Sequence, residues 1–361
     1  MMLRLQHWAS RRFVWLAATL LGMLYLHSPT ATAGTCAYVP DYPTYLRAVS
    51  TITGSITVGR DIPIGTEVYR ATFYTATVGR IFCQPGTYPR TRRFLTTPYP
   101  LSGYVHPTFG NRVYRTSVPG IGAVIWWNGQ AFPTTATDTY TVPTSLYPEL
   151  AFDLSLIKIG DVGAGTIRST DLPTFEYVQL GDNTLRIEFG GFTGSLNVVS
   201  RTCTTPDVPV ALGSHQMTEL SGIGTSTNWV NVPIRLNNCP SFHDAFRRNL
   251  TEDSVVSLTN RTANAIRFRV NPVTSVVNQA QGVMALQPDG VNQTATGIGI
   301  QMADAGGVPL AYGVNRASGL ALTATDNASY TFNLRARYYQ TGTTPTSGQA
   351  NGAATVTLIY E

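Results

Sequence analysis

The chain ends in Gly348-Gln-Ala-Asn-Gly-Ala-Ala-Thr-Val-Thr-Leu-Ile-Tyr-Glu361. Small or apolar side chains recur at every second position of this stretch, namely Ala350, Gly352, Ala354, Val356, Leu358 and Tyr360. A period of two is the pattern of a β-strand with one buried face. A final strand has an open edge unless another strand covers it, and open edges promote aggregation. The stretch therefore predicts a last strand that needs a partner from elsewhere.

The first 33 residues have the pattern of a secretory signal peptide. Three arginines precede the apolar run 13–26, and Ala31-Thr-Ala33 is a small-x-small cleavage pattern. The apolar run is too short to span a bilayer. We therefore expect cleavage after Ala33, export, and a mature chain that begins at Gly34 and has no membrane span. A short membrane anchor is the alternative reading of this segment.

The composition predicts an all-β mature chain. Only 12% of all residues are charged, Gly and Pro are frequent, and no long stretch has a helical period. Short apolar segments separated by Gly and Pro are typical of β-sandwiches or barrels. The length allows two domains, which we place at 34–201 and 202–361. The three signal-peptide arginines account for part of the net charge of +5, so the remaining +2 does not favour nucleic-acid binding.

Four cysteines follow the signal peptide, which predicts two disulfides in an exported chain. Three pairings are possible, and the order along the sequence favours Cys36–Cys83 and Cys203–Cys239. The cysteines form no C-x-x-C motif and have no histidine nearby, so no metal or other cofactor is expected. The three histidines of the mature chain are far apart, and no hydrolase or phosphate-loop motif is present. We therefore do not expect an enzyme, although carboxylates are numerous enough to leave a glycosidase pair open.

The second half resembles the subunits of chaperone–usher fimbriae. The resemblance lies in the segments Cys203 to Gly213, Val232 to Cys239, 295–304 and 332–342, and in a glycine fourteenth from the end with a penultimate tyrosine. It implies an incomplete immunoglobulin-like pilin fold that lacks its last strand. It also implies three partners: a periplasmic assembly chaperone, an outer-membrane usher, and the next subunit, which donates the missing strand. The residues implied in chaperone binding and assembly are Gly348, Val356, Leu358 and Tyr360.

Only Gly34 and Thr35 precede Cys36 in the expected mature chain. Ordinary subunits carry roughly a dozen alternating residues there as the donor strand. We therefore expect a subunit that accepts a strand but donates none, with its first half at the fimbrial tip on the bacterial surface. The arrangement resembles the two-domain tip adhesins, and the first half resembles the lectin domain of type 1 fimbrial adhesins, a β-barrel or sandwich. A structural initiator or cap that binds no glycan is the alternative.

The resemblance implies a glycan site in the first half. It is carried by Cys36, by Ile81-Phe-Cys83 followed by Tyr88-Pro89, and by Val178-Gln179 leading into Leu180-Gly-Asp-Asn183. The implied sugar contacts are the Gly34 amine, the Tyr88 ring, Gln179, and Asp182 or Asn183. The acidic residues of the mannose-binding members are absent, because Gln84-Pro-Gly-Thr87 stands at their place.

Two further features bear on the ligand. Arg90, Arg92 and Arg93 suggest an acidic glycan, because guanidinium binds carboxylates in a bidentate manner; Arg93 is the arginine that we expect to contact it. A charged, solvated strand edge is the alternative. Trp126 and Trp127 point to opposite faces of a strand, so we expect one in the core and one either packed at the surface or serving as a sugar platform.

Overall fold

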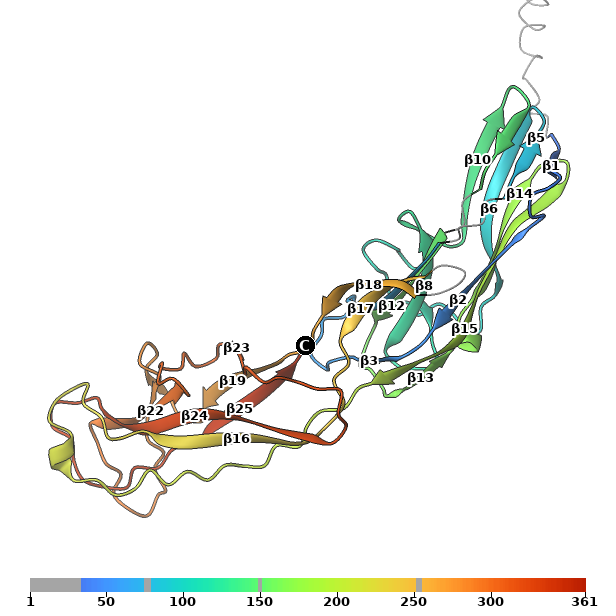
Figure 1. The fold of residues 1–361 in the computed structure, drawn as a ribbon. Coiled ribbons are helices and arrows are strands. Elements are labelled where there is room, and N and C mark those ends of the chain that lie inside the picture. The colour runs from blue at the N-terminus through green and yellow to red at the C-terminus, as the bar shows by residue number, and fades with distance from the viewer. Residues whose placement is uncertain (1–33, 75–78, 149–150, 251–254) are drawn as a thin grey trace, which may run out of the picture.

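The computed structural model describes residues 34–74, 79–148, 151–250 and 255–361. Strands dominate these residues, and their helical elements are two short 3-10 turns, η1 (Ser169–Asp171) and η2 (Met217–Glu219). The strands form two sandwiches placed end to end (Figure 1). The prediction of an all-β chain with two β-sandwich domains is confirmed. No helix in the described ranges is long and apolar enough to cross a bilayer, and the predicted signal peptide lies outside those ranges.

The first sandwich has two large sheets and one small sheet. One large sheet has the order β10-β6-β14-β15-β13, with β2 and β3 parallel to β15. The other has the order β18-β17-β4-β12-β8-β7, with β9 beside β8, and includes β17 (Ala245–Leu250) and β18 (Val255–Thr262) from the second half of the sequence. The small sheet, β1-β5-β11, lies at the end farthest from the second sandwich (Figure 1). The strands encoded by the first half are β1 (Cys36–Tyr38), β2 (Leu46–Ile52), β3 (Ser55–Thr57), β4 (Glu67–Tyr74), β5 (Ile81–Cys83), β6 (Gly86–Thr96), β7 (Tyr114–Arg115), β8 (Ile121–Trp127), β9 (Gln130–Ala131), β10 (Thr134–Tyr140), β11 (Thr144–Leu146), β12 (Ala151–Lys158), β13 (Gly165–Arg168), β14 (Thr174–Leu180) and β15 (Thr184–Val199).

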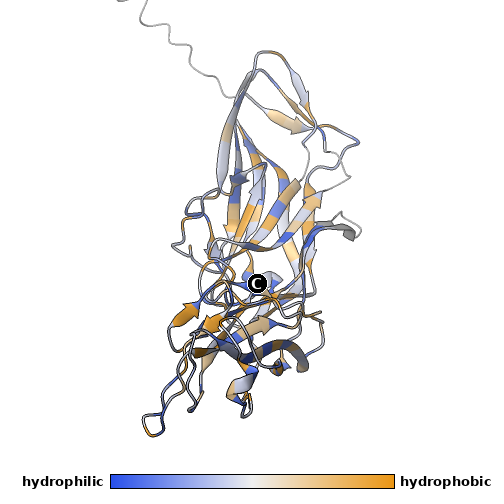
Figure 2. Ribbon diagram, turned by 90° about the vertical axis from the view of Figure 1, so that its left-hand side faces the viewer, coloured by the Kyte–Doolittle hydropathy of each residue, from blue (hydrophilic) through white to orange (hydrophobic). Residues whose placement is uncertain are grey.

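The core between the two large sheets is rich in aromatic side chains. Phe175 of β14 contacts both Phe152 and Phe132 edge to face, with ring centroids 5.0 and 4.9 Å apart. Gly190 of β15 lies under the Phe175 ring, and a Cβ there would come within 2.0 Å of it, so the residue must be glycine. Hydrophobic and hydrophilic residues alternate along the strands, as expected for sheets with one buried face (Figure 2).

The second sandwich consists of the sheets β16-β24-β22-β21-β20 and β23-β19-β25. Their apolar faces enclose a second core, which includes Phe268 and Phe332 with ring centroids 4.9 Å apart. The strands encoded by the second half are β16 (Val230–Cys239), β17 (Ala245–Leu250), β18 (Val255–Thr262), β19 (Ile266–Pro272), β20 (Val276–Asn278), β21 (Val283–Met284), β22 (Ile298–Asp304), β23 (Arg316–Ala317), β24 (Ala328–Gln340) and β25 (Ala354–Tyr360).

The hairpin β17–β18 belongs to the second half of the sequence but to the first sandwich in space. β17 pairs in parallel with β4, from Arg247 opposite Arg70 to Leu250 opposite Phe73. The chain therefore passes between the sandwiches three times: after β15, between β16 and β17, and between β18 and β19. Thr57 of β3 fixes the last two of these connections to the first sandwich. Its backbone and hydroxyl groups hydrogen-bond to Ser241 and His243 in one connection, and its carbonyl accepts a hydrogen bond from Asn264 in the other.

Each sandwich contains one disulfide. Cys36 and Cys83 lie opposite each other in β1 and β5, and the second bond joins Cys203 to Cys239 at the end of β16. Both predicted pairings are therefore confirmed. Residues of the first core fall between Leu46 and Val198, and those of the second between Cys203 and Tyr360, on either side of the boundary that we placed after Arg201. The β17–β18 hairpin is the exception to that division.

Candidate functional site

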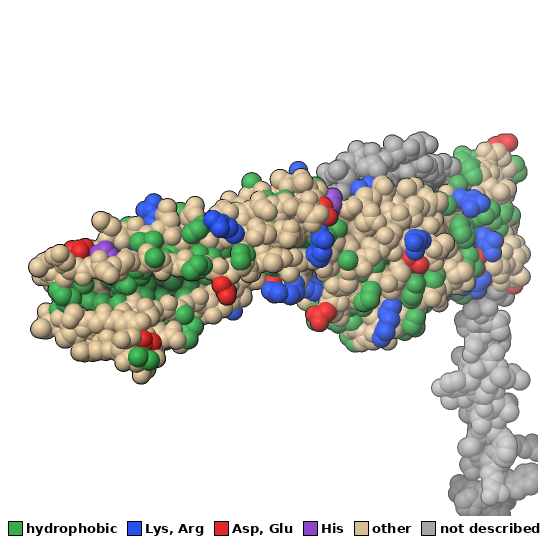
Figure 3. Space-filling model, turned by 90° about the horizontal axis from the view of Figure 1, so that it is seen from below, with side chains coloured by type: hydrophobic (Ala, Val, Ile, Leu, Met, Phe, Trp, Pro, Cys, Tyr) green, Lys and Arg blue, Asp and Glu red, His purple; other side chains and the backbone are tan. Residues whose placement is uncertain are grey.

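A groove with a volume of about 750 Å³ runs along β25 in the second sandwich. One wall is β25, and the other is the segment 205–213. The structure shows no regular strand in that segment, although Val208, Val210 and Leu212 pack against the core. Apolar side chains of β16, β22 and β24 form the floor, and hydrophobic side chains are visible along this hollow in Figure 3.

One edge of β25 faces the groove without a strand partner. β25 pairs with β19, in the register Phe268 to Leu358 and Val270 to Val356. The carbonyls of Ile266 and Val270 accept hydrogen bonds from Ser318 and Gly313, which lie on the side of β19 away from β25. Backbone groups alternate in direction along a strand, so those of Arg267 and Arg269 face β25. It follows that the backbone groups of Ala354, Val356 and Leu358 point away from β19 and into the groove. In the described chain, β25 has no second strand neighbour.

The four residues that we predicted for assembly lie on this strand and just before it. Tyr360 and Leu358 are buried, and Val356 is half-buried against the same core. The Tyr360 hydroxyl accepts a hydrogen bond from the Cys203 backbone N–H at 3.1 Å, which ties the end of β25 to the disulfide. Gly348 lies against the backbone of residues 293–295, where a Cβ would come within 2.4 Å of the Ala295 nitrogen.

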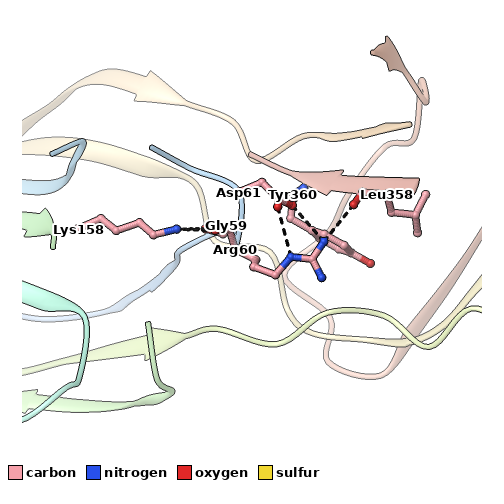
Figure 4. Close-up of polar contacts among 6 residues, drawn as sticks. All are labelled: Gly59, Arg60, Asp61, Lys158, Leu358 and Tyr360. Carbon is pink, nitrogen blue, oxygen red and sulfur yellow. Dashed lines mark hydrogen bonds and ion pairs between the residues drawn. The ribbon is translucent and has the colours of Figure 1, made fainter. Parts of the chain in front are cut away.

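Residues of the first sandwich close the groove at its junction end. The Asp61 N–H donates to the Tyr360 carbonyl at 3.2 Å, the Tyr360 N–H donates to the Asp61 carboxylate at 2.9 Å, and Arg60 Nη2 donates to the Leu358 carbonyl at 3.2 Å (Figure 4). Gly59 permits this approach, because a Cβ there would lie 2.2 Å from the Tyr360 oxygen. The edge of β25 is therefore occupied at its last residues and open before them.

Lys158, the last residue of β12, supports this junction from the first sandwich. It is buried, and its ammonium group donates to the carbonyls of Gly59 and Arg60 at 3.2 and 2.5 Å (Figure 4). Burial lowers its pKa, although Asp61 and Asp161 act in the opposite direction. The only lysine of the chain therefore holds the loop that meets β25.

The structure brings most of the predicted glycan contacts together at the far end of the first sandwich. Asp182 donates its N–H to the Gly34 carbonyl at 3.0 Å, and the Asn183 side chain hydrogen-bonds to both backbone groups of Cys36. The Tyr88 ring lies beside Gly34 but is fully buried, and its hydroxyl donates to the Gln84 carbonyl at 2.6 Å. The Tyr88 and Asn183 side chains thus hydrogen-bond to the backbone around Cys36, and Asp182 and Asn183 are the exposed members of the group.

Gln179 and Arg93 occupy other environments. Gln179 is 1% exposed, and its amide has no hydrogen-bond partner in the described chain. Arg93 forms an ion pair at 2.8 Å with the buried Glu176, which Arg186 also binds. The charge of Arg93 is therefore balanced within the protein.

Comparison with known proteins places the second half. The family model described as "Fimbrial protein" matches residues 191–361. This part of the chain is similar to fimbrial proteins, and we refer to residues 191–361 as the fimbrial domain. The groove and β25 both lie within it.

The match extends beyond the fimbrial domain. A "Fimbria adhesin protein" of Klebsiella pneumoniae is 24% identical over 317 residues, 85% of this chain and 89% of that protein. The CupB6 tip adhesin of Pseudomonas aeruginosa is similar over 91% of this chain and 94% of its own, with 14% identity and a TM-score of 0.35. The receptor binding domain of the adhesin MrkD1P of K. pneumoniae matches over 47% of this chain and 98% of its own, with 20% identity and a TM-score of 0.33. The predicted resemblance to chaperone–usher fimbrial adhesins is confirmed.

Two contacts of the fimbrial domain could not be found in the sequence. The sequence of residues 245–262 has the pattern of two ordinary strands of the second half. No feature of that sequence indicates that the first of them pairs with β4. Gly59-Arg60-Asp61 reads as a turn, and its partner Tyr360 is about 300 residues away. The only local signal for the second contact is the glycine itself, which marks a place where two backbones approach closely.

The buried Glu188 of β15 predicts a pH dependence of stability. Burial raises its pKa to about 8, although Arg92 lowers it. Because the folded state then holds a proton that the unfolded state releases near pH 4.5, the free energy of unfolding should fall as pH rises from about 5 to 8, by up to about 1.4 kcal/mol per pH unit. Glu188→Gln should remove this slope and stabilise the first sandwich at pH 8, as measured by urea unfolding followed by tryptophan fluorescence.

Glu176→Gln is the matched control for this prediction. Burial alone would raise the pKa of Glu176, but hydrogen bonds from Arg93 and Arg186 outweigh it, so the pKa is lowered. Glu176 therefore contributes stability at neutral pH that is lost as pH falls below about 4.5, and its replacement should destabilise the protein at pH 8. Equal effects of the two substitutions at pH 8 would contradict the assignment of Glu188.

Proposed function

We propose that this chain is the tip adhesin of a chaperone–usher fimbria, and that its fimbrial domain is completed by a strand from the next subunit. The observation that carries the proposal is the unpaired edge of β25 beside an apolar groove. An extended peptide laid there would pair its backbone with Ala354 to Leu358 and insert alternate side chains into the groove, which is strand addition at a sheet edge.

The proposal also names the partners that the chain would meet during assembly and adhesion. A periplasmic chaperone covers the same edge before assembly, an outer-membrane usher exchanges it for the next subunit, and the first sandwich binds a glycan receptor at the bacterial surface. The family match and the relation to a fimbria adhesin support this reading. The protein acts by binding and needs no catalytic step.

Site-specific crosslinking in assembled fimbriae tests the proposal. A photoreactive phenylalanine analogue at Val356, which faces the groove, should give an adduct with the N-terminal segment of one other subunit. The same analogue at Thr357, whose side chain lies on the other face of β25 and does not line the groove, is the control and should give little adduct. Equal yields at both positions, or no subunit adduct at Val356, would count against strand addition.

A further inference from the structure

A second cavity, with a volume of about 330 Å³, lies in the first sandwich between its two large sheets. It is lined by Arg90 and Arg92 of β6, Tyr177 of β14 and Thr134 to Ala136 of β10. Trp127 of β8, Asn128 and Gln130 of β9 complete the lining. The volume is at the lower end of the range for small-ligand sites, about 300–1,000 Å³. The cavity is separate from both the β25 groove and the group around Cys36.

Arg92 brings a positive charge to this cavity that the protein does not balance. Its neighbours are neutralised, because Arg93 pairs with Glu176 and Arg90 pairs with Asp138 at 2.5 Å. In the described residues Arg92 has no ion pair, and its buried Nε atom has no hydrogen-bond acceptor. The guanidinium lies instead over the Tyr177 ring, 4.5 Å from the centroid, which holds it in place but leaves the charge available.

Glu188 of β15 is the acid whose charge acts on Arg92, but no ion pair joins the two in the described residues, and the buried Glu188 Oε1 atom has no hydrogen-bond partner there. Burial raises the pKa of Glu188, which favours its neutral form. Arg92 is half-buried, and a partly desolvated cation without a counter-ion is costly, so an anion from outside would relieve that cost. The cavity is therefore prepared for a ligand with a negative group.

The hairpin β8–β9 supplies an aromatic face and two amides to the cavity. Asn128 and Gly129 both have positive φ, 47° and 75°, between the paired residues Trp127 and Gln130, which is a two-residue hairpin turn. The turn places the exposed amides of Asn128 and Gln130 at the mouth, beside the half-buried Trp127 indole. Amides bind hydroxyl groups and an indole face packs against a sugar ring.

Trp126 has a different role from Trp127. Its indole N–H donates to the Ser155 hydroxyl at 2.9 Å, and Arg70 covers its ring at 4.7 Å. Both indoles are half-buried, and Trp127 also packs against the first core and Tyr74, but Trp127 is the member of the pair that lines the cavity.

We propose that this cavity binds an acidic saccharide, with its carboxylate or sulfate on Arg92 and its ring against Trp127. The proposal rests on the proposed function, because it names the class of receptor that the first sandwich binds. Sialylated, uronic-acid and sulfated glycans share this chemistry, and neutral glycans do not.

Binding should be measured with the full chain, either with its chaperone or with a donor strand, because the β17–β18 hairpin is part of the first sandwich. Sialyllactose, a uronic-acid disaccharide and 6-sulfo-N-acetylglucosamine are compared with lactose and N-acetylglucosamine. Ala136→Glu places a carboxylate on an exposed position opposite Arg90, on the cavity side of β10. Thr137→Glu adds the same charge one residue away, on the other face of the strand, and is the matched control.

At least one acidic glycan should bind, and its neutral counterpart should not. Ala136→Glu and Arg92→Gln should each weaken binding by at least about tenfold, and salt should reduce the difference. Thr137→Glu should bind as the unmodified protein does. Equal binding by the two Glu variants would overturn the cavity assignment, and so would binding of neutral glycans alone.

The failure of the cavity assignment can be told apart from the failure of the proposed function. Loss of glycan binding on Asp182→Ala, with no loss on Ala136→Glu, would move the receptor site to the far end and leave the adhesin function intact. Absence of binding to every glycan would overturn both the cavity and glycan adhesion. The crosslink at Val356 would still report assembly in that case.

Discussion

A donor peptide should raise the melting temperature of the fimbrial domain by at least about 15 °C. The peptide would have about ten residues with apolar side chains at alternate positions, matching the length from Ala350 to Leu358. Five buried apolar side chains would contribute roughly 1.5–3 kcal/mol each, and each kcal/mol raises the melting temperature of a domain of this size by a few degrees. Differential scanning calorimetry of the full chain, with the peptide in trans or fused after Glu361 through a short linker, measures the shift.

The control is a peptide of the same length with serine at the apolar positions. It can still pair its backbone with β25 but cannot fill the groove, so the melting temperature should change little. A fimbrial domain that melts cooperatively at the same high temperature with and without either peptide would mean that its core is already complete. The incomplete-fold assignment would then be wrong.

Tyr360→Ser should abolish recovery of the chain by its chaperone after periplasmic expression. Tyr360 is 5% exposed, and removal of a buried aromatic ring costs about 3–5 kcal/mol. The substitution also leaves the Cys203 N–H without its acceptor. Deletion of residues 353–361 should have the same effect because it removes β25. Pull-down with the tagged cognate chaperone measures recovery.

Tyr360→Phe and Thr355→Ser separate the possible causes. Tyr360→Phe keeps the ring and loses only the hydrogen bond to Cys203, so most of the recovery should remain. Thr355 is exposed, and its substitution should have no effect. Undiminished recovery of the truncated chain would show that β25 is not the strand that the chaperone binds.

The sequence was most informative where the pattern was local. Alternation at Val356, Leu358 and Tyr360 predicted which face of the last strand is buried, because side chains in a strand alternate between its two faces. The order of the cysteines predicted both disulfides. In each case the information lay within a few dozen residues of sequence.

The candidate site in the first sandwich was harder to predict. The resemblance implied that Tyr88 and Gln179 contact a ligand, but both side chains are buried in the protein. Alternation defines two faces and does not say which is inside when both carry polar groups. The segment Arg90-Thr-Arg-Arg93 likewise did not indicate that Arg93 forms an ion pair and Arg92 does not, because the acidic partners come from other strands.

The three passages of the chain between the sandwiches have a mechanical consequence. Two bodies joined by one peptide can swing about it, whereas three separate passages restrict bending and twisting. Tension that enters through β25 passes to β19, which continues through residues 263–265 into the β17–β18 hairpin and from there into β4. A force along this path acts on the backbone hydrogen bonds between β25 and β19 and between β17 and β4, and on the covalent chain that connects these pairs. The first sandwich is therefore restricted in its movement relative to the second, and a force applied at its far end would reach β25 without first bending a flexible joint.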